Sequence, residues 1–206
     1  MTAQQIIDDI FHLYTDDTTE LSTTEELALL NRVYLKICSN RPYEFLKTNA
    51  TGSITSGAIT LPSDFLYLTE NTQTTNISVG QGEKVSKAIF VGTSKTPYKI
   101  INYSDRENGS SNEAYIDYSA SQIKFVDTTL SDTYSFDYIK IPENLILDST
   151  PIFPSPFHPA IGYGMATDGF IIQLFDKAKS YATENQAKYN SYISDLNYYN
   201  SQLRAE

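Results

Sequence analysis

Residues that could bind a cation or a phosphate are few in this sequence, and their spacing is unfavourable. Two pairs of adjacent carboxylates, Asp8-Asp9 and Asp16-Asp17, are the first candidates for a cation site. Neighbouring residues on a helix point in different directions, and the ordered oxygen ligands and turn glycine of a calcium loop are missing. Gly80-Gln81-Gly82 lies in a polar stretch without a following helix, which argues against a phosphate-binding turn.

The sulfur and imidazole groups also point to packing rather than chemistry. The single cysteine, Cys38, excludes an internal disulfide and falls on an apolar helical stripe, where a buried, inert thiol is expected. His12 and His158 each lie in or beside an apolar run. No spacing of histidines and carboxylates suits a transition metal. We therefore expect neither a metal nor another cofactor.

Motifs of catalysis are missing as well. The chain contains no GxSxG nucleophile turn, no Walker phosphate loop and no GxGxxG turn. A pair of carboxylates that meet only in the folded chain, as in a glycoside hydrolase, is left open as a rival interpretation. The sequence favours a protein that is not an enzyme.

Composition and charge narrow the class of protein. With 206 residues, 40% of them hydrophobic, the chain can bury a core without disulfides or metals. No apolar run is long enough to span a membrane, and the first residues lack the pattern of a secretory signal. A net charge of −10 argues against a protein that grips nucleic acid through its phosphates.

The acidic residues are concentrated at the start of the chain. Residues 1–31 contain seven acidic side chains and no lysine or arginine. One explanation is a solvated surface with carboxylates near helix N-termini, where the helix dipole stabilises them. The other is a surface that repels a polyanion.

Helical signals dominate residues 1–50. Two capping-box patterns mark helix starts: Thr2 with Gln5, and then Ser22 with Glu25 or Thr23 with Glu26. Apolar residues follow each start at helical spacing, and Asn40-Arg41-Pro42 ends the second helix. These patterns predict an antiparallel pair of helices.

Residues 51–142 change to short segments rich in β-branched and aromatic residues. Strands are predicted at 53–55, 58–61, 87–91, 98–103, 113–118, 122–126 and 133–141. The last segment alternates, with Tyr134, Phe136 and Tyr138 on one face. Tyr118-Ser119-Ala120-Ser121-Gln122 predicts a tight hairpin, and the polar stretch 69–86 a long loop or a partly ordered arm. The region is predicted to be an antiparallel, barrel-like sheet.

Residues 143–206 return to helical patterns. Ser155 as N-cap and Pro156 at the first position predict a helix start. One helix of about 50 Å is predicted from about 170 to 203. Its stripe, with steps of three and four, comprises Phe175, Ala178, Ala182, Asn185, Tyr189, Tyr192, Leu196, Tyr199 and Leu203. The stripe lies either on the chain's own fold or partly on a neighbouring subunit.

The expected fold is therefore α+β. The N-terminal helical hairpin (1–50) and the C-terminal helices (143–206) form one composite helical lobe, into which the β region (51–142) is inserted. The chain has 16 tyrosines, whose large apolar body and polar tip suit protein interfaces. The predicted subunit interface consists of Tyr189, Tyr192, Leu196, Tyr199 and Leu203.

Several short phrases, in their order and spacing, resemble phage head-to-tail adaptor (neck connector) proteins. Tyr43 is a departure, because tryptophan is more usual at that position. The phrases are Leu29-Leu30-Asn31-Arg32-Val33-Tyr34, Arg41-Pro42-Tyr43-Glu44-Phe45-Leu46, Ile59-Thr60-Leu61-Pro62-Ser63-Asp64-Phe65, Tyr138-Ile139-Lys140-Ile141-Pro142 and Phe153-Pro154-Ser155-Pro156-Phe157-His158.

The resemblance implies a homo-oligomeric ring, commonly a dodecamer, in the neck of the virion below the portal protein and above further neck or tail proteins. Double-stranded DNA would pass through the ring without specific binding, and assembly would take place in the host cytoplasm. The interface on the last helix could then contact the portal. An acidic lining would keep DNA sliding, and the residues expected at the channel or its rim are Asp8, Asp9, Asp16, Asp17, Glu25 and Glu26.

Two other functions are kept as alternatives. The chain could be another neck or tail-tube ring subunit, which the same resemblance allows. It could also be a monomeric binding module whose β region holds a partner through exposed tyrosines.

Overall fold

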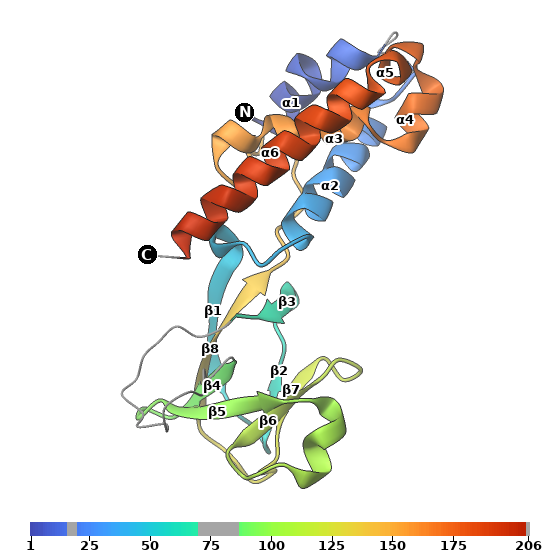
Figure 1. Cartoon of the computed structure of the whole chain (residues 1–206). Helices are drawn as coiled ribbons and strands as arrows, with labels where there is room; N and C mark the ends of the chain where they lie inside the picture. Colours follow the sequence, from blue (N-terminus) through green and yellow to red (C-terminus); the bar gives the residue numbers. More distant parts are fainter. Residues whose placement is uncertain (16–19, 70–86, 205–206) are drawn as a thin grey trace. The chain divides into compact units, whose positions relative to one another are not determined.

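The structure, a computed structural model, describes residues 1–15, 20–69 and 87–204. The chain divides into two compact units (Figure 1). The helical unit combines Met1–Leu46 with Ile141–Glu206, and the β unit is Lys47–Lys140. The fold class is α+β, as the sequence predicts.

The helical unit takes its elements from both ends of the chain. Its N-terminal part holds α1 (Ala3–Asp9), η1 (Phe11–Tyr14), α2 (Thr23–Ser39) and η2 (Glu44–Leu46). Its C-terminal part holds η4 (Ser155–Phe157), α3 (Pro159–Ala166), α4 (Gly169–Leu174), α5 (Asp176–Ser180) and α6 (Ala182–Leu203).

Both predicted N-terminal helix starts are confirmed. The Thr2 hydroxyl accepts a hydrogen bond from the Gln5 backbone N–H, and the Gln5 side chain accepts one from the Thr2 N–H. Ser22 and Glu25 form the same reciprocal pair before α2. Each capping box satisfies two backbone donors that the first helical turn leaves without partners.

Helix α3 forms the centre of the helical unit and contacts α1, α2 and α6 (Figure 1). Two glycines allow this close approach. A Cβ at Gly162 would lie 2.6 Å from Ile10 Cγ2, and one at Gly164 would lie 2.6 Å from Val33 Cγ1 and 3.0 Å from the Tyr189 ring. Real Cβ atoms do not approach other atoms this closely, so the packing requires glycine at both positions.

The predicted start of this helix is shifted. Ser155 and Pro156 lie in the short 3-10 turn η4, whose N-cap is Pro154, and α3 itself begins at Pro159. Proline suits the first position of a helix because its missing N–H would have no partner there. The proline cluster therefore marks the helix start, but a different proline occupies the first α-helical position.

The prediction of one helix from about 170 to 203 is wrong for this structure. The chain is helical over that range, but extended backbone at Phe175 (φ −118°, ψ 120°) separates α4 from α5. A second interruption at Tyr181 (φ −100°, ψ 8°) separates α5 from α6. Phe175 is buried and the Tyr181 ring packs 5.9 Å from that of Tyr14, so tertiary contacts hold both interruptions.

The β unit contains eight strands in its described residues. They are β1 (Lys47–Ser53), β2 (Ala58–Thr60), β3 (Phe65–Leu68), β4 (Ala88–Val91), β5 (Thr96–Ile101), β6 (Glu113–Asp117), β7 (Gln122–Phe125) and β8 (Thr133–Lys140), with the 3-10 turn η3 (Tyr103–Asn108) between β5 and β6. Strands β1 and β3 lie largely outside the predicted segments.

The strands form one sheet with the order β1-β8-β4-β5-β6-β7-β2, and β3 also pairs with β8. Strand β8 buries Phe136 and Tyr138 on the predicted face, and Ile139 on the opposite face is buried too. Strands β6 and β7 form the predicted hairpin, in which Ser121 has a positive φ of 51°. One pairing differs from the prediction, because β5 and β6 run parallel. The sheet is therefore mixed and barrel-like.

The central position of α3 leads to a prediction about two glycines. The substitution Gly162→Ala should lower the free energy of unfolding by about 1–3 kcal/mol, because the new methyl group overlaps the branched carbon of Ile10. Gly169→Ala is the matched control, since nothing lies within 4 Å of a Cβ at that position. The control should leave stability unchanged or raise it by up to about 1 kcal/mol. Urea unfolding of the two variants measures the difference, and equal effects would contradict the packing described here.

Candidate interaction surfaces

The predicted interface on the last helix packs mainly within the helical unit. Leu196 is 0% exposed. The Tyr192 ring stacks on Tyr163 with ring centroids 5.8 Å apart, and the Tyr189 ring faces Gly164 of α3. These three residues therefore contact the chain's own fold, one of the two arrangements left open by the sequence.

The end of α6 is more accessible. The Tyr199 ring packs 5.8 Å from that of Phe157 and is 38% exposed, while its neighbour Tyr198 is 69% exposed. Leu203, one turn further along α6, is half-buried. The surface available to a partner on this helix therefore centres on Tyr198 and Tyr199.

The rings of two tyrosines lie beside the ammonium group of Lys188 on α6. Lys188 Nζ lies 5.9 Å from the centre of the Tyr14 ring and 5.2 Å from that of Tyr163. It also forms an ion pair with Glu184 at 2.6 Å. This carboxylate and the contact with Tyr14 raise the pKa of Lys188, so it stays charged. The cluster joins η1, α3 and α6, and it gives part of the tyrosine content a structural role.

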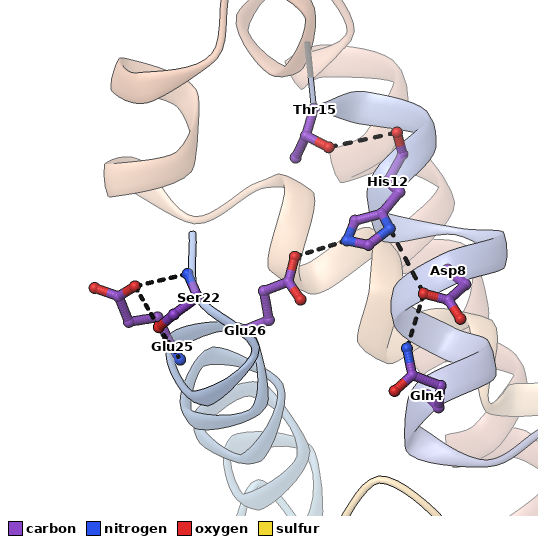
Figure 2. A network of polar contacts seen from close by, with 7 residues as sticks. All are labelled: Gln4, Asp8, His12, Thr15, Ser22, Glu25 and Glu26. Carbon is purple, nitrogen blue, oxygen red and sulfur yellow. Dashed lines mark hydrogen bonds and ion pairs between the residues drawn. The ribbon is translucent and has the colours of Figure 1, made fainter. Parts of the chain in front are cut away.

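The acidic residues near the start of the chain have different environments (Figure 2). The His12 Nε2–H donates to the Glu26 carboxylate at 2.6 Å, and His12 Nδ1 lies 3.6 Å from Asp8 Oδ1. Gln4 also donates to Asp8. Glu26 is only 6% exposed, and its carboxylate faces His12 inside the unit. The prediction that Glu26 lies at the channel or its rim is therefore wrong for this structure.

The remaining acids of that prediction lie elsewhere. Glu25 is exposed and caps α2 through Ser22, whose hydrogen bonds lower the pKa of the Glu25 carboxyl (Figure 2). Asp9 is exposed at the end of α1. Asp16 and Asp17 lie outside the described residues. Of the six acids predicted at the channel, Asp9, Glu25 and the half-exposed Asp8 are therefore the ones that the structure describes as accessible to a partner.

A hollow of about 460 Å³ in the β unit was not foreseen from the sequence. The parallel pairing of β5 with β6 ends at Ile101 and Tyr115, while β6 continues to Asp117 against β7. The hollow lies where strands β5 and β6 cease to pair, and exposed Tyr103 and Tyr118 lie at its edge. Its apolar lining comes from Ile100, Ile101 and Ile116. Strands β5 and β6 are joined by a 3-10 turn and pair in parallel, and no local sequence pattern predicts such a pairing. The sequence therefore could not reveal this site.

The polar groups of the hollow are already engaged within the unit. Asp117 accepts hydrogen bonds from Lys124 Nζ at 2.7 Å, Ser119 Oγ at 2.6 Å and the Ala120 N–H, and these lower its pKa to about 2. The Arg106 guanidinium lies 4.3 Å above the Tyr103 ring. The surfaces left for a partner are aromatic and aliphatic, which suits protein contact better than a polar small molecule.

The groups considered for chemistry lie in unreactive surroundings. Cys38 is 1% exposed, and burial raises the pKa of its thiol to about 12. His158 is buried and its Nε2–H donates to the Phe153 carbonyl. Among the described residues, no group of three or more His, Cys, Asp or Glu side chains could hold a metal ion. Gly80-Gln81-Gly82 and most of the predicted loop 69–86 lie outside the described residues.

No helix in the described part of the chain combines the length and apolar character needed to cross a membrane.

Comparison with known proteins identifies the family. No curated protein matches the chain. The family model for the SU10 adaptor protein matches residues 1–206, which is the whole sequence. The chain therefore belongs to the SU10 adaptor protein family and is a structural adaptor of the phage virion neck that interacts with other head and tail proteins.

Proposed function

We propose that this chain forms a closed homo-oligomeric ring below the portal protein, through which double-stranded DNA passes, and that it has no catalytic activity. The observation that carries the proposal is the family match over the full sequence. A dodecamer is the expected stoichiometry, assembled in the host cytoplasm before the tail proteins bind. An adaptor of this kind acts by joining two assemblies, so its function resides in its surfaces.

The exposed side chains of the helical unit support an assembling protein. A ring requires heterologous contacts, in which one patch of each subunit binds a different patch of the next. Large apolar side chains with more than a third of their surface exposed are available for such contacts: Leu13, Ile141, Ile146, Ile152, Phe170, Leu174, Tyr181, Tyr198 and Tyr199. Aromatic residues are enriched at protein interfaces, which favours the tyrosine pair on α6 as one of the two patches.

The charge of the chain suits a passage for DNA. A surface that neutralised phosphates would bind the genome by counterion release and slow its movement. Asp8, Asp9 and Glu25 lie in the region of the chain that lacks basic residues. Glu26 and His12 pair internally, so the repulsion of DNA would come from the exposed acids.

The direct test of the ring is the mass of the protein in solution, alone and mixed with the portal of the same phage. Multi-angle light scattering and negative-stain imaging should show rings, or a monomer that forms rings on the portal. A chain that stays monomeric with every neck protein would contradict the proposal. The aromatic hollow of the β unit would then indicate a monomeric binding module.

A substitution on α6 tests whether its exposed end is an interface. Tyr198→Ser should weaken ring or portal association about tenfold, as expected for the loss of an aromatic contact, and should leave the unfolding temperature unchanged. Tyr118→Ser makes the same change at a tyrosine of the β unit that is also 69% exposed, and it tests whether the hollow there contributes to association instead. Equal association of wild type and the Tyr198→Ser variant, measured by sedimentation, would remove α6 from the interface.

Charge reversal tests the acidic passage. Asp9→Lys should slow DNA ejection from assembled virions at low salt, because each ring subunit gains a cation that binds phosphate. The rate should recover as salt rises, since counterion release then favours binding less. Asp195→Lys makes the same charge change on exposed α6 and serves as the control. If Asp9→Lys leaves both the ejection rate and its salt dependence as in wild type, the acidic residues of α1 do not act on DNA.

A further inference from the structure

The segment from α4 to α6 is interrupted although its sequence is continuous. Residues 170–203 contain neither glycine nor proline, the residues that usually account for sharp breaks in a helix. The buried side chains on either side of both interruptions also keep helical spacing. They are Ile171, Phe175, Ala178, Asn185 and Leu196. In one straight helix these side chains would lie on a single face.

A second set of apolar residues would share one face only in a straight helix. Phe170, Leu174 and Tyr181 are 59%, 37% and 45% exposed. Their spacing of four and then seven residues would align them on a single face of a continuous helix. In the interrupted form α4 lies off the axis of α6, so these side chains do not share one helical face (Figure 1).

The interrupted form also leaves a buried amide without partners. Asn185, in the first turns of α6, is 0% exposed, and neither its Oδ1 nor its Nδ2 has a hydrogen-bond partner in the structure described here. A buried polar group without a partner destabilises the state that contains it. Asn185 belongs to the stripe that both forms share, so removing this cost requires a polar partner that the described residues of the free subunit do not supply.

We propose that residues 169–203 form a two-state element, with three helices in the free subunit and one continuous helix in the assembled ring. The inference rests on the proposed ring function. The continuous form aligns Phe170, Leu174 and Tyr181 on one face, where a neighbouring subunit can bury them during assembly. A conformational equilibrium shifts only when the states differ in their interactions, and this exposed face provides that difference.

A proline at residue 176 is compatible with the interrupted form but not with the continuous helix. Asp176 is the first residue of α5, where proline fits, and Phe175 before it has the extended backbone that proline favours. In a continuous helix the same proline would lie in the interior and break it. The Asp176→Pro variant should therefore fold and unfold like wild type as a free subunit. Its ring formation should be weakened at least about 100-fold.

The control is Asp176→Ala, which removes the same carboxylate and is compatible with both states. Circular dichroism and thermal unfolding establish that each subunit is folded, and light scattering with imaging measures ring formation with the portal. Rings of wild type and Asp176→Ala, but not of Asp176→Pro, are the expected result. Rings of Asp176→Pro would overturn this inference and leave the proposed function intact. A wild-type protein that never forms rings would overturn both.

A distance measurement keeps the test independent of how the proline variant folds. Spin labels at Gln173→Cys and Asn190→Cys, both exposed positions, report on α4 and α6. Cys38 is buried with a raised thiol pKa and should not be labelled. In a continuous helix the backbone separation is about 26 Å. Labelled subunits diluted into unlabelled rings should show that separation, and a distance unchanged from the free subunit would overturn the inference.

Discussion

Close packing around α3 is the constraint on which the helical unit depends. Helix α3 is eight residues long and is buried along most of its length between elements from both ends of the chain. Gly162 receives Ile10, and Gly164 receives Val33 and the Tyr189 ring. A larger residue at Gly162 would push α3 away from Ile10, and one at Gly164 would push it away from α2 and α6. The positions of the His12–Glu26 pair and of the tyrosines around Lys188 follow from this contact.

Local signals in the sequence predicted the structure correctly where the interacting residues lie within a few positions of each other. The capping boxes at Thr2 and Ser22 were predictable because both partners lie within three residues of each other. The hairpin between β6 and β7 and the alternation in β8 were predictable for the same reason. Strand β1 was largely missed because its residues Lys47–Ser53 are polar or small, and it is held by pairing with β8 along its whole length.

The candidate surfaces were less predictable, because burial depends on residues distant in sequence. Glu26 has the sequence context of an exposed acid in the first turn of α2, yet His12 and the α1 region cover it. The stripe of α6 was correct in its spacing, but only tertiary packing determines that Leu196 is covered and Tyr198 is open. The hollow beside Tyr103 depends on a parallel strand pair that no local pattern indicates.

The tyrosines fall into a buried group and an exposed group, which suits a subunit that must be stable both alone and in the proposed ring. Tyr14, Tyr163 and Tyr192 pack internally and stabilise the helical unit, whereas Tyr198 and Tyr118 stay exposed. An exposed tyrosine keeps its hydroxyl in water, so a free subunit can carry it with less exposed apolar surface than a leucine or phenylalanine would add. In a closed ring every subunit contacts two neighbours, and the contact that closes the ring forms within one assembly. This raises the effective concentration of the last two surfaces, so a ring can be stable even when each interface is weak. A few exposed aromatic residues are therefore compatible with both a stable free subunit and a stable ring.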